Sequence, residues 1–409
     1  MVLLDALAPL ARARGIVLSA IHVNHGISPH AQRWTDFCAV QCAARDVALV
    51  THRLTLGPGR STNLEAVART ARYDALRTAH ADVIALAQHA DDQAETVLLQ
   101  LIRGAGPRGL SAMPRFQPGN PALWRPFLDL TRAALAAYAA QRGLAWVEDE
   151  SNADAHHRRN LLRHDIAPRL TAHFPGYPRT LVRAAEHQGE ASDLLDTLAA
   201  ADAGGAITAA GLDCARLKTL SPARARNLLR WFLRDHGLRS PSTAHIGDML
   251  RQLAAARPDA RIRIVHDGVE IGCHHGRVIV HAPPPAAYVR AWHGAAEVTL
   301  PGGTLAFAPA QGSGIAAAMV AQHPVTLRSR AGGERMQLAA NRPRRALKKL
   351  LQDADLAGWQ RQALPLVWCG DRLAAVPGIG VDLAFHAAAG ESGWIVDWRP
   401  TRWQRKALD

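Results

Sequence analysis

Segments typical of strands alternate with segments typical of helices over about the first 110 residues. Apolar, strand-like runs occupy 16–23, 47–56 and 82–88, and stretches of helical periodicity, such as 2–14 and 63–80, lie before or between them. Because two parallel strands need a crossover between them, usually a helix, this alternation predicts a parallel sheet covered by helices. The expected fold class is α/β with a Rossmann-like parallel sheet. Such sheets bind ligands beyond the carboxyl ends of their strands.

The remainder of the chain changes from helical to strand-rich patterns. Helical periodicity dominates from 126 to 256, whereas 261–282 contains two alternating runs around Asp267-Gly268 and a third after Gly276, as in a hairpin followed by another strand. Three consecutive prolines at 283–285 mark a stiff boundary. We expect three domains: an N-terminal domain at 1–185, a mainly helical middle domain at 186–320 and a small strand-rich C-terminal domain at 321–409.

The charge balance favours a polyanionic partner. The chain holds 48 Lys and Arg against 35 Asp and Glu, a formal net charge of +13. Such an excess is typical of proteins that bind nucleic acids. A GC-rich coding bias, which enriches arginine and alanine, explains the same excess without any partner.

No segment indicates a membrane span or an export signal, so we expect a cytoplasmic protein. No apolar run reaches the roughly 18 residues of a spanning helix. The five cysteines are odd in number and scattered, unlike a disulfide framework. Cys38 and Cys42 share one predicted helix face, but no second pair of cysteines or histidines completes a metal site.

Polar residues follow the first predicted strand. His22, Asn24 and His25 end this strand, and Gly26 lets the backbone turn sharply after them. At the carboxyl edge of a parallel sheet these side chains can face a ligand. Histidines at strand ends also form ordinary hydrogen bonds to backbone, so the spacing alone leaves both explanations open.

A group of carboxylates follows the third predicted strand and opens a helix. Asp91 and Asp92 lie four and three residues before Glu95, so the carboxylates share a helix face next to His89. Paired carboxylates suit a Mg²⁺ ion that keeps several waters and bridges phosphates. Acidic residues in a first helical turn also complement the helix dipole, which explains them without a ligand.

A glycine-rich turn with arginine ends the same helix. Arg103, Gly104 and Gly106 resemble an anion cradle, in which a guanidinium and backbone amides meet phosphate oxygens. The structural alternative is that Gly104 caps the carboxyl end of the helix and Pro107 stops it.

Two arginine pairs have the spacing of neighbours on a helix face. Arg69 and Arg72 are three residues apart, and Arg159 and Arg163 are four apart in a basic segment after an acidic loop at 148–150. Such pairs suit contacts to phosphates and bases. A solvated basic face, or local ion pairs, would produce the same pattern.

Several sequence blocks, taken in order, resemble the tRNA(Ile)-lysidine synthetases. The N-terminal blocks are HVNHG, ARTARY, QHADDQAETVLLQLIRGAG with GLSAM, WRPFLDLTR, and WVEDESN followed by RRNLLRH. The C-terminal blocks are RSRAGGERM, LKKLLQD and WQRQALPLVWCGDRLAAVPGIGVD. Their order and spacing are specific, whereas each block alone is weak. The resemblance covers most of the chain and is least diagnostic over 185–320.

This resemblance implies an adenine nucleotide alpha-hydrolase-like sheet and a two-step ligation on the wobble cytidine of tRNA(Ile) with a CAU anticodon. ATP adenylates the carbonyl oxygen of the base and releases pyrophosphate. The ε-amine of free L-lysine then displaces AMP, and Mg²⁺ and arginine stabilise the charge on the phosphates. The sequence itself does not determine the oligomeric state, and a homodimer is one expectation.

The resemblance also implies roles for the residues described above. Asp92, Glu95 and His25 would be catalytic, with Asp92 at the metal and a carboxylate or His25 accepting the proton of the lysine ammonium. The residues expected to bind the nucleotide are His22, Asn24, His89, Arg103, Gly104 and Gly106. Those expected to contact tRNA are Arg69, Arg72, Arg159, Arg163, Lys348 and Lys349.

Two departures from the family pattern qualify the activity. The family carries an SGGxDS loop after its first strand, whose amides cradle phosphates, and this sequence contains no such motif. Residues 1–4 look like those that follow the loop, so we expect a central strand and the phosphate loop to be missing. The chain as written is expected to bind ATP poorly and to be inactive. Gln88 stands where the family often has histidine, which would weaken nucleotide contact.

Two other functions remain open at this point. A tRNA-thiolating enzyme of the same ATP-pyrophosphatase type usually needs paired cysteines, and no CxxC occurs here. A non-catalytic tRNA-binding relative would keep the basic domains without the phosphate loop.

Overall fold

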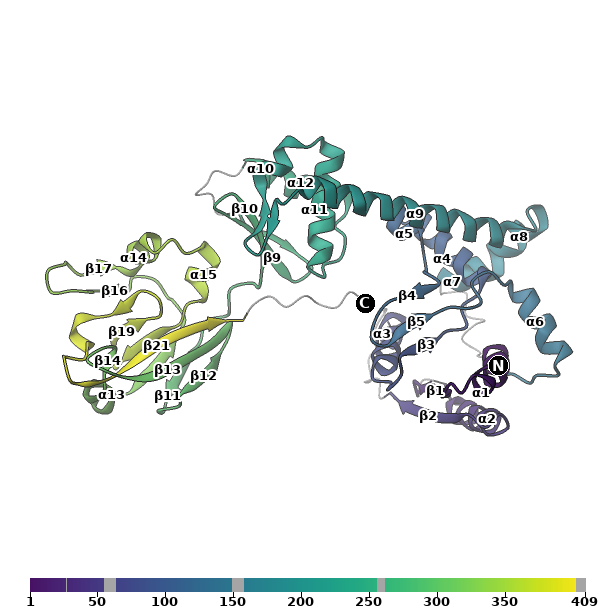
Figure 1. The fold of residues 1–409 in the computed structure, drawn as a ribbon, viewed down its shortest axis with the longest axis horizontal. Coiled ribbons are helices and arrows are strands. Elements are labelled where there is room, and N and C mark those ends of the chain that lie inside the picture. The colour runs from purple at the N-terminus through teal and green to yellow at the C-terminus, as the bar shows by residue number, and fades with distance from the viewer. Residues whose placement is uncertain (27, 55–63, 149–157, 256–261, 402–409) are drawn as a thin grey trace. The chain divides into compact units, whose positions relative to one another are not determined.

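A computed structural model describes residues 1–409 except 27, 55–63, 149–157, 256–261 and 402–409. The chain divides into two compact units, 1–194 and 195–409, and the division falls within helix α9 (Tyr177–Ala203) (Figure 1). Over the described residues, no helix is long and apolar enough to cross a bilayer.

The first unit begins with the alternation of helices and strands that the sequence predicts. The elements in order are α1 (Val2–Ala13), β1 (Ser19–Asn24), α2 (Ala31–Ala43), β2 (Ala48–Arg53), α3 (Leu64–Arg77), β3 (Val83–Ala85) and α4 (Ala90–Ile102). The apolar faces of α1 and α2 pack on the first two strands around buried Ala8, Cys42 and Val47. The predicted α/β class is confirmed.

The strands of this unit form two sheets in the described part of the chain. β1 pairs with β2 in parallel, and β3 pairs in parallel with β5 (Ala122–Trp124), which also pairs with β4 (Phe116–Gln117). Within the described residues no strand joins β1 to β3. Among the described residues, both of these strands therefore keep one edge outside the ladders.

The remainder of the first unit is mainly helical, as predicted. Its helices are α5 (Pro107–Leu110), α6 (Arg132–Gln141), α7 (Arg158–Leu161), the π-helical turn η2 (Leu162–Ile166), α8 (Ala167–His173) and the start of α9. A buried carboxylate ties α1 to α6, because Asp5 accepts hydrogen bonds from Arg45, Tyr138 and Arg142.

The second unit begins with a five-stranded sheet covered by helices. The strand order is β6 (Ile207–Thr208), β7 (Gly211–Asp213), β10 (Arg277–His281), β9 (Val269–His274) and β8 (Ile264–His266). Helices α10 (Cys214–Thr219), α11 (Pro222–Asp235) and α12 (Thr243–Ala255) contribute their apolar faces to one core with these strands. The hairpin at Asp267-Gly268 is confirmed, and both residues have positive φ, as a two-residue primed turn requires.

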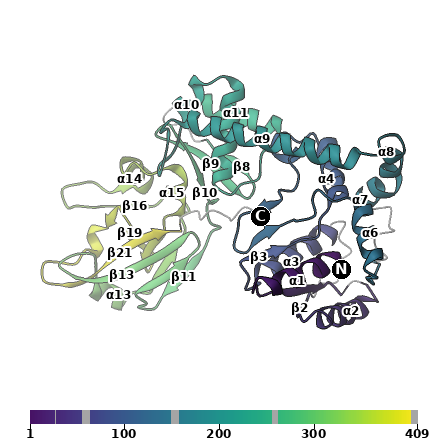
Figure 2. The same cartoon turned by 45° about the vertical axis from the view of Figure 1, so that its right-hand side comes forward.

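The C-terminal part of this unit consists of two packed sheets and a helical layer. One sheet has the order β11 (Val289–Trp292), β15 (Val325–Arg328), β18 (Leu366–Cys369), β19 (Arg372–Val376) and β20 (Gly380–Val381). The other has the order β12 (Glu297–Leu300), β13 (Gly303–Gln311), β21 (Ser392–Pro400) and β14 (Ile315–Ala316). The long strands β13 and β21 run side by side in both views (Figures 1 and 2).

Alternation along the central strands separates two cores. Val367 and Ala374 point into the core between the sheets, whereas their neighbours Leu366 and Leu373 face the opposite side. There they meet Leu347, Leu350 and Leu351 of α14 (Leu347–Asp353), which is followed by α15 (Gly358–Ala363). Short elements complete the unit: α13 (Ala317–Gln322), β16 (Arg335–Met336), β17 (Arg345–Ala346) and η3 (Leu383–Phe385).

Strand pairing changes one of the expected domain boundaries. The boundary expected at 320 falls between strands of the same sheets, because β11 pairs with β15 and β14 pairs with β21. The strands between 289 and 316 therefore belong with the C-terminal residues. Their partner strands are distant in sequence. The prolines at 283–285 lie between β10, which pairs within the first sheet of this unit, and β11, which pairs within a C-terminal sheet.

Candidate active site at the start of helix α4

The candidate site is built on the turn between β3 and α4. β3 ends at Ala85 and α4 begins at Ala90, so the first turn of α4 follows the carboxyl end of a parallel strand. His89 precedes the helix in extended conformation, and its backbone N–H donates to Asp92 Oδ2 at 3.1 Å. This bond satisfies one of the amide groups that a helix start leaves without a helical partner.

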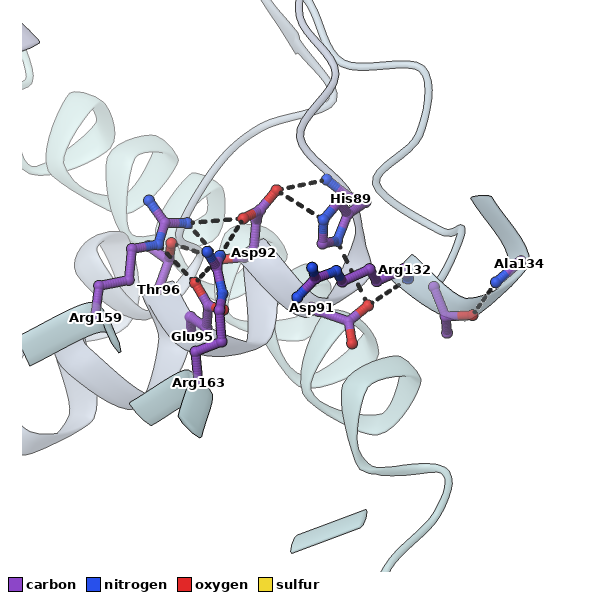
Figure 3. Close-up of polar contacts among 10 residues, drawn as sticks. His89, Asp91, Asp92, Glu95, Thr96, Arg132, Ala134, Arg159 and Arg163 are labelled. Carbon is purple, nitrogen blue, oxygen red and sulfur yellow. Dashed lines mark hydrogen bonds and ion pairs between the residues drawn. The ribbon is translucent and has the colours of Figure 1, made fainter. Parts of the chain in front are cut away.

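Glu95 is the most buried carboxylate of the site, with only 5% of its surface exposed. Arg159 Nε donates to its Oε2 at 2.6 Å. Arg163 donates from Nε to Oε1 at 2.8 Å and from Nη2 to Oε2 at 3.0 Å (Figure 3). Short, charge-assisted bonds of this kind compensate a buried carboxylate for its lost water.

Asp92 shares the same two arginines. Its Oδ1 accepts from Arg159 Nη2 at 3.2 Å and from Arg163 Nη2 at 3.3 Å, while its Oδ2 faces the backbone N–H of His89. Two carboxylates and two guanidinium groups therefore form one cluster with balanced charge (Figure 3).

Asp91 points to the other side of the helix start. Its Oδ2 accepts from the backbone N–H of Arg132 at 2.7 Å and lies 3.4 Å from His89 Nδ1. Burial acts to raise the pKa of Asp91, but the bonds from His89 and Arg132 outweigh it and lower that pKa below its usual value. Burial, together with the charges of Asp91 and Glu95, raises the pKa of the nearby Tyr177.

Arg159 and Arg163, which were expected to contact RNA, form ion pairs with the carboxylates of α4. The sequence predicts one shared helix face for Arg159 and Arg163, and the structure confirms it, because both meet the same carboxylates. We expected them to point toward RNA, and the structure instead pairs them with Asp92 and Glu95. The partners are more than 60 residues apart in the sequence, and neither segment alone specifies the other.

Arg103 lies at the opposite end of α4 from the cluster, and its expected contact with the nucleotide stays a prediction. It follows the last residue of α4, about 16 Å along the helix from Asp92 at 1.5 Å per residue. Gly104 has φ +69° and its N–H donates to Leu101 O at 3.0 Å, as in a glycine that caps a helix. Gly106 immediately precedes α5, so these residues form a turn between two helices, and their contact with the nucleotide stays a prediction.

The polar residues at the end of β1 make contacts within their own segment. The Asn24 side chain donates to Ala31 O and Thr35 Oγ1 and accepts from the backbone N–H of Gly26, so these bonds fix the loop after the strand. Burial lowers the pKa of His22, whose Nδ1 lies 3.7 Å from Cys38 Sγ. His25 is half-buried at the end of this segment.

Family models match three parts of the chain. A model described as a PP-loop domain matches residues 1–170. A TilS substrate binding domain matches 212–279, and a TilS substrate C-terminal domain matches 325–398.

Curated relatives align over nearly the whole chain. A protein of Nitrosomonas europaea named tRNA(Ile)-lysidine synthase is 43% identical, covering 98% of this chain and 90% of the relative. The chain belongs to the tRNA(Ile)-lysidine synthase family. A second member, from Azoarcus, is 40% identical over 98% of this chain and 89% of its own length.

The other residues expected to contact tRNA belong to helices α3 and α14. α3 is confirmed as a helix, but the side chain of Arg69 lies outside the described residues. Arg72 is exposed, with its guanidinium 5.9 Å from the ring of Tyr73. Lys348 and Lys349 occupy the exposed face of α14.

The family's metal does not fit on Asp92 and Glu95 in this arrangement. Three of their four carboxylate oxygens accept N–H donors from Arg159 and Arg163, and the fourth accepts the backbone N–H of His89. A magnesium ion needs free oxygen ligands in a near-octahedral set. The expectation that Asp92 holds Mg²⁺ would require these donors to leave.

Proposed function

We propose that this protein ligates lysine to the wobble cytidine of tRNA(Ile) in an ATP-dependent reaction, as the names of its relatives indicate. Membership of the family over nearly the full chain carries this proposal. The PP-loop match over 1–170 supports ATP as the second substrate. A strand–turn–helix site with both carboxylates and arginines supports chemistry that brings an amine and phosphates together.

The chemistry proceeds in two balanced steps. A base carbonyl oxygen is a poor leaving group, so it first attacks the α-phosphorus of ATP, and pyrophosphate leaves. The ε-nitrogen of lysine, after losing a proton, then bonds to the same ring carbon, and AMP leaves with the original oxygen. The enzyme must therefore hold an ammonium group near an acceptor for its proton and stabilise anionic oxygens.

The cluster provides both kinds of contact. We place the lysine ammonium against Glu95 and Asp92 and the phosphates against Arg159 and Arg163, which exchange partners as the substrates enter. The lowered pKa of Asp91 keeps this carboxylate ionised at neutral pH. His25 and the cluster carboxylates remain the proposed proton acceptors, and contacts of Arg69, Arg72, Lys348 and Lys349 with tRNA are proposed on their charge.

Magnesium is proposed as a companion of ATP rather than a resident of the protein. All four oxygens of Asp92 and Glu95 accept N–H donors, so we assign the ion to phosphate oxygens and derive no step from it. We further propose that β1 and β3 take one more strand between their open edges, and that the phosphates bind where it ends. A cytoplasmic location and a homodimer are also proposals.

A non-catalytic tRNA-binding protein is the second candidate. It is favoured by the absence of an SGGxDS motif in the sequence and of a strand between β1 and β3 in the described residues. In this case the basic surfaces would bind tRNA(Ile) without modifying it.

Lysine incorporation distinguishes the two candidates. The purified 409-residue chain, and the same chain preceded by a strand and an SGGxDS turn, are incubated with ATP, labelled lysine and tRNA(Ile) carrying a CAU anticodon. We expect incorporation by the preceded form, loss of incorporation in its Glu95→Gln variant, and no labelling of tRNA with another wobble base. Binding of tRNA without incorporation by either form favours the second candidate. Equal activity of both forms refutes the proposed strand.

A further inference from the structure

Two histidines and an aspartate meet on the second unit, on elements that carry no residue of the proposed reaction site. His274 ends β9, His275 occupies the turn to β10, and Asp355 lies between α14 and α15. One ligand atom from each residue lies within 4.8 Å of the others. In the part of the chain that the structure describes, three such metal-ligating groups gather only here.

His275 and Asp355 are already in contact. His275 Nε2 lies 2.8 Å from Asp355 Oδ2, and the ring of His274 is 4.0 Å from that of His275, centroid to centroid. The side chains of His275 and Asp355 are 61% and 74% exposed, so an ion from solvent can reach them.

Both of these residues stand where the backbone favours glycine or asparagine. His275 has φ +47° and Asp355 has φ +55°. His275 and Gly276 form the two-residue turn between β9 and β10, in which asparagine-glycine is preferred. Histidine and aspartate are among the side chains that adopt this conformation most often after glycine, so both turns present a metal-ligating side chain to solvent.

A packed joint holds the two segments next to each other. The ring of Trp359 in α15 stacks on His281 of β10 with 4.1 Å between centroids and 10° between planes. A Cβ added to Gly272 of β9 would overlap the same ring. Trp359 lies four residues after Asp355, and Gly272 lies two before His274, so the joint positions the ligand atoms before any ion binds.

We propose that His274, His275 and Asp355 bind a divalent transition metal of the Zn²⁺ class. Two imidazole nitrogens and one carboxylate are a ligand set typical of zinc, whereas magnesium and calcium prefer oxygen. Tetrahedral bonds of 2.0–2.1 Å place ligand atoms roughly 3.3 Å apart, which exposed side chains reach by small rotations. Water completes the fourth position, and the ion links the β9–β10 turn to the loop before α15.

Metal titration of the full chain tests this site. The chelator-treated protein is titrated with Zn²⁺ by calorimetry, with Mg²⁺ as the competitor. We expect one ion per chain, unaffected by excess Mg²⁺, and an affinity at least ~10-fold weaker in His275→Ala and Asp355→Asn, since even outer-shell changes cost this much. The matched control is His245→Ala. His245 forms a second pair of neighbouring histidines with His266, and its loss should leave the Zn²⁺ affinity unchanged.

Two further measurements exclude other binding sites. Co²⁺ in place of Zn²⁺ should give a visible spectrum without a thiolate charge-transfer band. Such a band would assign the ion to a site with cysteine, such as the Cys214 and Cys273 pair, and overturn the proposal. Zn²⁺ should slow hydrogen exchange at 352–357 in the wild type and leave Asp355→Asn unaffected. Equal Zn²⁺ affinity in wild type and both ligand variants, or no stoichiometric binding, also overturns it.

Discussion

The cluster of Asp92, Glu95, Arg159 and Arg163 should behave as one energetic unit. Glu95→Gln keeps the shape of the side chain and removes its charge, which leaves two partly buried guanidinium groups without their main partner. Breaking a buried ion pair costs about 3–5 kcal/mol. Because the arginine side chains are 31% and 23% exposed, we expect the lower end, about 3 kcal/mol.

A double-mutant cycle separates coupling from simple loss. Arg163→Ala removes three bonds but leaves Glu95 paired with Arg159, so we expect about 2 kcal/mol. In the double variant with Glu95→Gln, both substitutions remove the same contacts between Glu95 and Arg163. The total loss of stability should therefore be about 3 kcal/mol rather than the sum of about 5 kcal/mol. The expected coupling energy is therefore about 2 kcal/mol, within the range for residues in one network.

Hydrogen exchange of the α4 amides measures these free energies where the cluster lies, without requiring the two units to unfold together. The matched control is Arg158→Ala, which removes an exposed arginine next to the cluster and should change α4 by less than ~0.5 kcal/mol. Additive losses from Glu95→Gln and Arg163→Ala, within ~0.5 kcal/mol, would refute the coupling.

Three further predictions test other parts of the chain. The lowered pKa of Asp91 stabilises the fold above the ordinary pKa of 3.8, and this stability is lost as the pH falls through the lower pKa of the folded state. The urea midpoints of wild type and Asp91→Asn should therefore differ at neutral pH and converge in acid. A constant difference at every pH would contradict this prediction. Gly272→Ala should cost about 1–3 kcal/mol in thermal unfolding, because its Cβ overlaps Trp359, and adding Trp359→Leu should recover part of the loss; no loss contradicts the close approach. Burial and the neighbouring Cys273 raise the pKa of Cys214 to about 12, so iodoacetamide should alkylate Cys214 only after unfolding. The half-buried Cys38 should be alkylated earlier, and mass spectrometry measures both rates. Equal rates for the two cysteines would contradict this prediction.

The sequence predicted elements whose evidence is local. The strands β1, β2 and β3 are short apolar runs and the helices between them have periodic apolar faces, so both patterns are visible within about ten residues. The hairpin at Asp267-Gly268 was predicted because one dipeptide determines its turn.

Features that depend on distant partners were not predictable in this way. Arg159 and Arg163 meet Glu95 across more than 60 residues, and nothing in either segment alone specifies the other. β5 is three residues long and becomes a strand by pairing with β3. The strands at 289–316 belong to the C-terminal sheets for the same reason, because their partners begin at residue 325.

The balance of charge in the cluster has a consequence for substrate binding under the proposed function. When the ammonium of lysine takes Glu95 and Asp92, Arg159 and Arg163 lose their partners inside a partly buried site, which is unfavourable unless an anion replaces them. Phosphate oxygens are such an anion, so each substrate reduces the cost of binding the other.

Lysine and nucleotide should therefore bind with positive coupling. We expect this in the chain preceded by a strand and an SGGxDS turn. Its affinity for lysine should rise about 5–150-fold when a non-hydrolysable ATP analogue is present. By linkage, lysine should raise the affinity for the analogue by the same factor. Calorimetry with each ligand in the presence and absence of the other measures both factors. Glu95→Gln should abolish the coupling, because the carboxylate that exchanges partners is gone, whereas Arg158→Ala should retain it. Independent binding of the two ligands would mean that the arginines keep their carboxylates throughout, and that the cluster serves the fold rather than the substrates.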